Sequence, residues 1–363
     1  MALMSFFPET YDEAIRRTRT WLASVQEIRP QAREQRALLY PEENLDFTWI
    51  EGTSPKASRA LLLTAGLHGI EGYAGIALLD LFVNEYLSRV EPSTDVYIVP
   101  VINPWGLKHE RRVNPNNVDL NRNFLDAADF SQDLNPEYAR LASFLHPERP
   151  VSPRDRYLFY LQTLWCIRKC GQETLRRVYP QGQNRFPRGL HYAGQERQPE
   201  TQYLLDLVHT IAREHESIIH LDMHTGFGPK NTLTLVFPAS ESRSVETLRD
   251  MLKFPHITKV AAADFYPIQG DLSEYLHQTL PARTSTQVLT FALEYGTIGH
   301  RLASLRAIVL ENRLYWHGAT SPRVARWVRH EFRELFYPHA PTWRAQVIAQ
   351  ARKVFQSIVE GRG

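Results

Sequence analysis

The sequence predicts an α/β fold with a mixed, mostly parallel central sheet, formed by a single domain over residues 1–363. Residues 60–67 and 95–102 are continuous apolar segments, as expected of strands that are buried on both faces of a parallel sheet. Residues 71–90, which lie between them, carry apolar side chains at helical spacing. A strand, a helix and a second strand in this order indicate a right-handed crossover unit.

The other elements follow along the chain from the same patterns. Residues 9–36 predict an amphipathic helix followed by a connector, and residues 38–51 predict an irregular pair of strands. A polar stretch over residues 103–130 predicts a long loop, which inside a compact domain is usually functional. Further helices are expected at residues 201–215, 244–252, 301–316, 323–336 and 343–359, and further strands at 218–224, 232–237 and 287–294.

Residues 150–199 are rich in Arg, Tyr, Trp, Pro and Gln, and they predict an insertion in the domain. We expect a helix over residues 156–179 and an irregular segment over residues 180–199. The C-terminal helices, at about residues 322–360, are expected to pack on the sheet from outside.

The composition is that of a globular protein with a sizeable core, since 43% of the 363 residues are hydrophobic and 23% are charged. The formal net charge is +2 and the Lys and Arg residues are dispersed, so we expect neither a nucleic-acid nor a membrane partner. We find no apolar run long enough to span a bilayer and no secretion signal. Cys166 and Cys170 are too few for a disulfide framework, and free thiols fit a cytoplasmic location.

A candidate metal site is formed by His68, Glu71 and His224. His68 follows the first apolar strand, Glu71 lies one helical turn later, and His224 stands where another apolar strand stops. Ligands bind beyond the carboxyl ends of strands in an α/β sheet, so these side chains are expected to meet there. Zn²⁺ favours two imidazoles and one carboxylate when a fourth position is kept for water. Asp222, two residues before His224, is a candidate hydrogen-bond partner for a ligand imidazole.

A second signal is the polar loop after the strand at residues 95–102. It contains Arg111, Arg112 and Arg122 together with several Asn side chains. The planar fork of arginine suits a carboxylate or a developing oxyanion. The loop therefore predicts a place for anionic parts of a substrate.

These motifs together resemble the zinc carboxypeptidase superfamily, which includes the aspartoacylase and succinylglutamate desuccinylase enzymes. They occur in the family's order from about residue 60 to about residue 300, and the chain looks closest to an uncharacterised bacterial branch of unknown function. The resemblance implies a three-layer αβα domain. The matching segments are Gly-Leu-His-Gly-Ile-Glu at 66–71, Asn-Pro-Trp-Gly at 103–106, Val-Asp-Leu-Asn-Arg-Asn-Phe at 118–124, Asp-Met-His-Thr-Gly at 222–226 and Leu-Glu-Tyr-Gly-Thr at 293–297.

The resemblance also implies roles for single residues. His68, Glu71 and His224 would hold one Zn²⁺ per chain. Arg112 matches the arginine that polarises the scissile carbonyl, with Arg111 as the alternative. The remaining matches are Asn121 and Arg122 to the pair that grips the substrate carboxylate, and Glu294 to the general base that activates water.

Glu294 can also be interpreted without the family. It ends a strongly apolar strand, so its carboxyl group is expected to be partly desolvated, with its pKa raised toward neutrality. The resulting hypothesis is a zinc-dependent hydrolase that cleaves an amide bond beside a free carboxylate, acting on a small peptide. The alternatives are a deacylase of N-acyl amino acids and a catalytically silent binding protein of the same fold.

Some features lie outside the matched motifs. Carboxypeptidases of this superfamily often carry a mobile tyrosine near the substrate carboxylate, and Tyr266 and Tyr275 are candidates without a matching motif. The insertion over residues 150–199 could form a pocket wall or a lid. His191 and Tyr192 within it could reach the site, but we expect an ordinary surface role for both.

Overall fold

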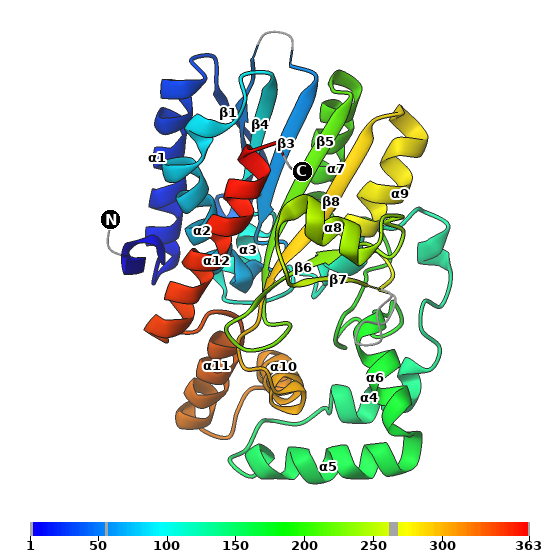
Figure 1. The fold of residues 1–363 in the computed structure, drawn as a ribbon. Coiled ribbons are helices and arrows are strands. Elements are labelled where there is room, and N and C mark those ends of the chain that lie inside the picture. Colours follow the sequence, from blue (N-terminus) through cyan, green and yellow to red (C-terminus); the bar gives the residue numbers. More distant parts are fainter. Residues whose placement is uncertain (1–2, 55–56, 261–267, 362–363) are drawn as a thin grey trace.

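The structure is a computed structural model that describes residues 3–54, 57–260 and 268–361. In these residues one eight-stranded sheet runs through the molecule in the order β1-β2-β4-β3-β5-β8-β6-β7, with helices on both faces (Figure 1). The central strands β4, β3, β5 and β8 are mutually parallel, and the outer pairs are mixed. The predicted α/β fold with a mixed sheet is confirmed. The strands are β1 (Arg33–Tyr40), β2 (Leu45–Gly52), β3 (Arg59–Ala65), β4 (Thr94–Val99), β5 (Ser217–Thr225), β6 (Leu233–Phe237), β7 (Ile257–Lys259) and β8 (Gln287–Tyr295).

The two faces of the sheet bury separate hydrophobic cores. Leu61 and Leu63 of β3 pack into the core on one face, whereas Leu62 packs into the core on the other. This alternation is why the central strands carry apolar residues on both faces. The first face is covered by α1 (Tyr11–Ile28), α2 (Gly72–Glu85), α8 (Val245–Leu252) and α12 (Pro341–Val359), and the second by α7 (Pro199–Glu214) and α9 (Leu272–Thr284).

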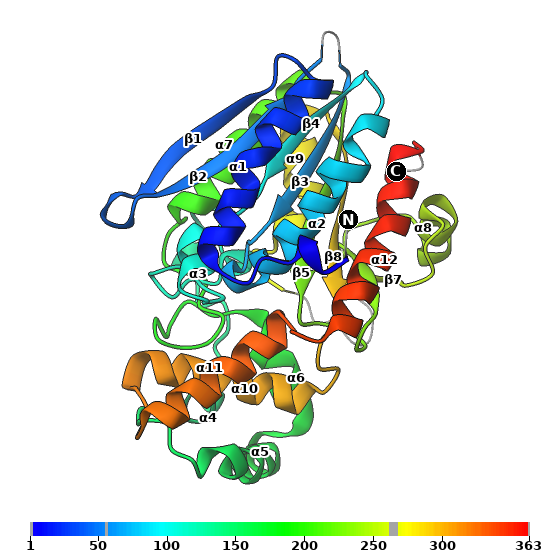
Figure 2. The ribbon, with the colours of Figure 1, turned by 90° about the vertical axis from the view of Figure 1, so that its left-hand side faces the viewer.

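A group of helices lies beyond one end of the sheet, at the bottom of Figures 1 and 2. The carboxyl ends of β3, β5 and β8 face this group, since the chain passes from β8 directly into it. Its members are α4 (Tyr138–Leu145), α5 (Asp155–Cys170), α6 (Gln172–Gln181), α10 (Arg301–His317) and α11 (Pro322–Phe336), and the short helix α3 (Pro104–Lys108) follows β4. None of the helices in the described part of the chain is long and apolar enough to span a bilayer.

Several predicted elements differ in their bounds. The first helix ends at Ile28. The strands β1 and β2 form the predicted irregular pair, with a register shift between Leu38 and Tyr40, but β1 begins earlier than predicted, at Arg33. The helix predicted over residues 156–179 is two helices, α5 and α6, because Gly171 between them has a φ of +87° that ends the first. The elements α4, α9 and β7 were not predicted. The start of α9 is capped by Asp271, whose side chain accepts from Glu274 N.

Candidate functional site

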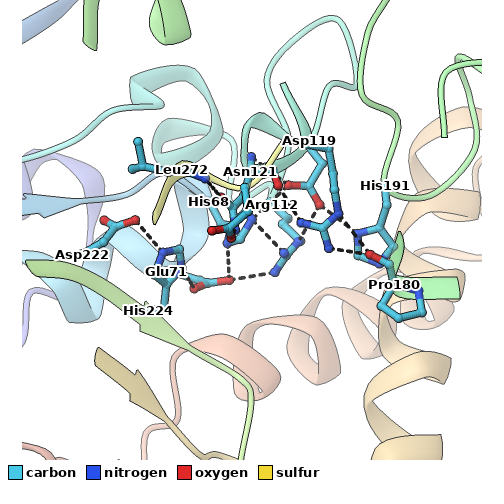
Figure 3. Close-up of polar contacts among 12 residues, drawn as sticks. His68, Glu71, Arg112, Asp119, Asn121, Pro180, His191, Asp222, His224 and Leu272 are labelled. Atoms are coloured by element: carbon cyan, nitrogen blue, oxygen red, sulfur yellow. Dashed lines mark hydrogen bonds and ion pairs between the residues drawn. The ribbon is translucent and has the colours of Figure 1, made fainter. Parts of the chain in front are cut away.

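Three side chains that are distant in sequence meet beyond the ends of β3 and β5. His68 follows β3, Glu71 lies in the short 3-10 turn that leads into α2, and His224 is near the end of β5. One ligand atom from each lies within 4.8 Å of the others, and all three side chains are buried. His68 Nδ1 is 3.0 Å from Glu71 Oε1, and His224 Nδ1 is 3.2 Å from Glu71 Oε2 (Figure 3). The predicted metal ligands are therefore brought together.

The turn between His68 and Glu71 is fixed by close backbone packing. A Cβ atom on Gly69 would lie 2.1 Å from the carbonyl carbon of Gly106, so a side chain at this position has no room. Gly69 N donates to Arg112 O at 3.2 Å, and Ile70 N donates to Arg111 O at 2.9 Å. The arginine loop is thus hydrogen-bonded to the turn that carries two of the candidate ligands.

Each imidazole also contacts a carboxylate through its other nitrogen. Asp222 Oδ2 lies 2.6 Å from His224 Nε2, as the sequence predicted, and Asp119 Oδ1 lies 3.0 Å from His68 Nε2. A hydrogen on Nε2, donated to a carboxylate, leaves the lone pair of Nδ1 free to bind a cation. His68 Nδ1 is buried and has no hydrogen-bond partner among the described residues. The donor set therefore fits a metal ion.

The electrostatic environment of the three side chains favours a positive charge between them. Burial alone would lower the pKa of His224, but Asp222 and Glu71 hold it well above its usual value. Burial alone would raise the pKa of the Glu71 carboxyl, but His68 and His224 hold it below its usual range. A proton on an imidazole compensates part of the negative charge of the surrounding carboxylates. A divalent cation bound by both imidazoles and the carboxylate would compensate more of it.

Arg112 lies directly beside the candidate ligands. Its Nη1 donates to Glu71 Oε1 at 2.9 Å, and its Nε donates to Asp119 Oδ2 at 3.4 Å (Figure 3). Its Nη2 also lies 2.7 Å from His68 Nε2, a contact that suits the opposite tautomer of the ring. A metal ion held by His68 would favour the tautomer with the hydrogen on Nε2, which donates to Asp119 Oδ1.

Glu294 is placed next to the site by strand pairing. The parallel strands β5 and β8 set His224 opposite Glu294. Glu294 Oε2 is buried without a hydrogen-bond partner among the described residues. Burial raises the pKa of Glu294 to about 7. The positive charge of nearby His224 lowers this pKa, and the negative charge of Glu71 raises it further. A carboxyl group that titrates near neutral pH is well suited to general acid and base chemistry.

The other predicted arginine, Arg111, points away from the candidate ligands. Its Nη1 donates to Glu311 Oε1 of α10 at 2.7 Å, and its guanidinium carbon lies 3.8 Å from the ring centroid of Tyr315. Of the two arginines proposed to polarise a carbonyl, the structure brings only Arg112 to the candidate ligands.

Asn121 and Arg122 lie near the site but are already bonded within the protein. Asn121 donates to Asp271 Oδ2 at 2.9 Å and accepts from Leu272 N at 2.9 Å. Arg122 is buried, and its Nη2 and Nε donate to Pro180 O at 2.8 and 3.1 Å. The carbonyl group of Pro180 thus occupies the position that a substrate carboxylate would take at this guanidinium.

The insertion contributes a residue that we expected at the surface. His191 is buried, so that expectation is wrong; its Nδ1 lies 2.8 Å from Asp119 Oδ2. Burial lowers the pKa of His191 to about 4, so the neutral ring donates its Nδ1 hydrogen to Asp119. Tyr179 of α6 packs edge-on against His191, with ring centroids 4.9 Å apart. Asp119 lies in the matched loop motif, whereas the irregular sequence around His191 offered no comparable signal.

Two of the tyrosines named from the sequence, Tyr192 and Tyr275, lie in a hydrophobic core. Tyr192 is buried and joins the core beneath α7 and α9, so its expected surface position is also wrong. Tyr275 is buried in α9, and its hydroxyl has no hydrogen-bond partner among the described residues. Tyr266 lies outside the described residues.

Comparison with known proteins places the chain in a family. Residues 36–350 match the model of DUF2817, described as a protein of unknown function. The chain belongs to this family. The predicted branch of unknown function is thereby confirmed. No curated protein matches the sequence.

Solved structures similar to this DUF2817 protein include carboxypeptidases, as the motifs predicted. Bovine thrombin-activatable fibrinolysis inhibitor, solved with a tick carboxypeptidase inhibitor, is 16% identical with a TM-score of 0.47, covering 88% of this chain and 97% of its own. A metallo-carboxypeptidase from Burkholderia cenocepacia is 16% identical with a TM-score of 0.42, covering 83% of this chain and 68% of its own. At these values the likeness concerns the fold, and function must be inferred from the site itself.

Proposed function

We propose that this DUF2817 protein is a zinc-dependent hydrolase that cleaves an amide bond beside a free carboxylate. The observation that carries the proposal is the convergence of His68, Glu71 and His224, with Glu294 next to them. Glu294 Oε2 has no hydrogen-bond partner among the described residues. Two imidazole nitrogens and one carboxylate favour Zn²⁺ over Mg²⁺ or Ca²⁺, which prefer oxygen ligands.

The chain's own residues supply the remaining parts of an amide hydrolysis. When bound, the ion supplies Lewis acidity, which lowers the pKa of water and polarises a carbonyl group. Glu294, with a pKa of about 7, takes a proton from the attacking water and passes it to the leaving nitrogen. Arg112 donates to the oxyanion that develops on the carbonyl oxygen, which requires it to release Glu71 Oε1.

Recognition of the substrate carboxylate is assigned to Arg122, supported by Asn121. A carboxylate that displaces the Pro180 carbonyl would exchange a neutral acceptor for a charged one, which strengthens both hydrogen bonds. Arg122 is enclosed by the insertion, since a Cβ atom on Gly182 would lie 2.8 Å from its Cδ. This enclosure suits a small substrate, so a deacylase of N-acyl amino acids is the second candidate.

The test combines metal analysis with four compounds, which are two candidate substrates and the carboxamide-blocked form of each. The purified protein is expected to hold about one zinc per chain and to hydrolyse an N-acyl dipeptide or an N-acyl amino acid, but not the carboxamide-blocked form of either. His68→Ala is the matched variant that should lose the zinc. Zinc retained by His68→Ala would contradict the ligand assignment. A loaded protein that cleaves none of the substrates would instead support a silent binding protein.

A further inference from the structure

Helix α5 presents an apolar face to solvent. Five of the eight large apolar side chains that are exposed in the described part of the chain belong to this one helix. Their spacing of three and four residues puts them on one stripe. We call them the α5 face: Tyr157 (71% exposed), Leu158 (39%), Leu161 (62%), Leu164 (64%) and Trp165 (60%).

The other side of α5 is fully used by the fold. Phe159 and Cys166 are buried in the cluster that α5 forms with α4, α6 and α10. The α5 face is therefore not required for packing within the chain. Exposed apolar patches of this kind on a folded protein mark sites of interaction with another molecule or a membrane.

The position of α5 at the end of the molecule limits the shape of a partner that can contact it. Figures 1 and 2, which differ by a quarter turn, both place α5 at the extreme lower end of the molecule, outside α4 and α6. The helix is thus an outward ridge rather than a wall of a groove. Such a ridge can lie against an extended plane with all of its apolar side chains in contact at once.

The surroundings of the α5 face are strongly basic, although the formal net charge of the whole chain is only +2. The one acidic residue of α5, Asp155, is buried and bonded to Arg313 at 2.7 Å, so it does not offset the cations. Exposed Glu148 and Glu173 lie beyond the two ends of the helix and are outnumbered by the cations around it. Lys169 Nζ lies 5.1 Å from the Trp165 ring centroid. The exposed cations of α5 and its flank are Arg154, Arg156, Arg168 and Lys169, and neighbouring α11 adds Arg323, Arg326 and Arg329.

The whole-chain charge predicted no membrane partner, but from the exposed α5 face we propose that this helix docks the protein on an anionic phospholipid surface. Leu, Trp and Tyr side chains enter the boundary between headgroups and acyl chains, while flanking Arg and Lys contact the lipid phosphates and carboxylates. The same charges disfavour a second copy of the chain. Antiparallel pairing of two α5 helices would set Arg154 and Arg156 of one beside Arg168 and Lys169 of the other.

The test is cosedimentation of the full chain with unilamellar vesicles. We compare phosphatidylcholine alone with phosphatidylcholine that contains about one-third phosphatidylserine. The protein should bind the anionic vesicles, less so as salt is raised, and should not bind the neutral ones. Leu161→Gln/Leu164→Gln should weaken binding on the order of tenfold or more, because two apolar insertions are lost. Leu38→Gln, at an apolar position that is 55% exposed on β1, is the matched control and should bind like the unchanged protein.

A second variant tests the charges without touching the apolar side chains. Arg168→Gln/Lys169→Gln alters exposed positions only, so it should keep the thermal stability while losing affinity and salt dependence. Failure of the unchanged protein to bind anionic vesicles overturns the proposal, as does binding by both double variants that equals binding by the unchanged protein. A species of twice the chain mass in light scattering, reduced to one chain by Leu161→Gln/Leu164→Gln, would instead assign the face to a second copy.

Discussion

The contact between Asp222 and His224 should set the affinity of the metal centre. Asp222 is buried, and its Oδ2 lies 2.6 Å from His224 Nε2 while its Oδ1 accepts from Thr64 Oγ1 at 2.6 Å. Both oxygens are thus used, and the carboxylate charge is directed at the imidazole. We expect Asp222→Asn to leave the fold intact and to weaken zinc binding, since the ring becomes a poorer electron donor.

The size of this effect follows from the type of hydrogen bond. A bond to a charged acceptor contributes about 1.5–3 kcal/mol net, and a bond between neutral groups about 0.5–1.5 kcal/mol. The difference of about 1.4 kcal/mol corresponds to about a tenfold weaker affinity for zinc. If the amide of Asn turned its NH₂ group toward the ring, the loss would approach about a hundredfold.

The assay is competition for zinc with a chromophoric chelator, and the chain offers a matched control. Asp95 Oδ2 lies 3.0 Å from His215 Nε2, a buried contact of the same chemistry at the opposite end of the sheet. Asp95→Asn should lower stability without altering the affinity for zinc. An unchanged affinity in Asp222→Asn, or an equal loss in both variants, would refute the reasoning.

Three further predictions concern catalysis, the insertion and stability. The kcat/KM of the proposed hydrolase should fall about tenfold per pH unit below about 7, where Glu294 gains a proton. Glu294→Gln should lack this acid limb of the pH profile and lose about 10²–10⁴-fold in rate, with its zinc content equal to that of the unchanged protein. His191→Leu removes the donor to Asp119 and should weaken zinc binding, whereas His191→Asn, which keeps a donor and tolerates the local φ of +50°, should restore it in the chelator assay. Burial would raise the pKa of Asp155, but Arg313 holds it below its usual range, so the pair stabilises the fold above pH about 4 and loses that effect as pH falls. Asp155→Asn should therefore lower the free energy of unfolding by about 3–5 kcal/mol at neutral pH, with a smaller difference near pH 2, as denaturant titration would show.

The elements that were predicted well from the sequence are the buried strands, because burial on both faces requires mostly apolar side chains. The strands β3, β5 and β8 are largely apolar on both faces because both of their faces are covered, so a buried strand is the element that fits them best. In contrast, β7 has only three residues, and α9 contains Pro281 within the helix, so neither shows a clear period. The Asp-x-x-Glu start of α9 at Asp271 was an available signal that was not used.

In the candidate site too, some residues could be predicted from local sequence patterns, whereas others depend on contacts that only the fold creates. His68, Glu71 and His224 could be predicted because strand ends meet at one edge of a sheet. His191 could not, because its contact with Asp119 spans 72 positions and starts from an irregular segment. Likewise, Arg111 and Arg112 are adjacent in sequence, and only the fold sends one of them to Glu311 and the other to Glu71.

The hydrogen bond from His191 to Asp119 couples the conformation of the insertion to ion binding at the proposed metal site. Because Asp119 in turn holds His68, local opening of the segment around His191 and release of an ion are coupled equilibria. This coupling is reciprocal: if the closed segment increases the binding free energy of an ion, the bound ion stabilises the closed segment by the same amount. Addition of zinc should then slow amide exchange over residues 182–193, and a proteolytic cut in this segment should weaken zinc binding at the proposed site.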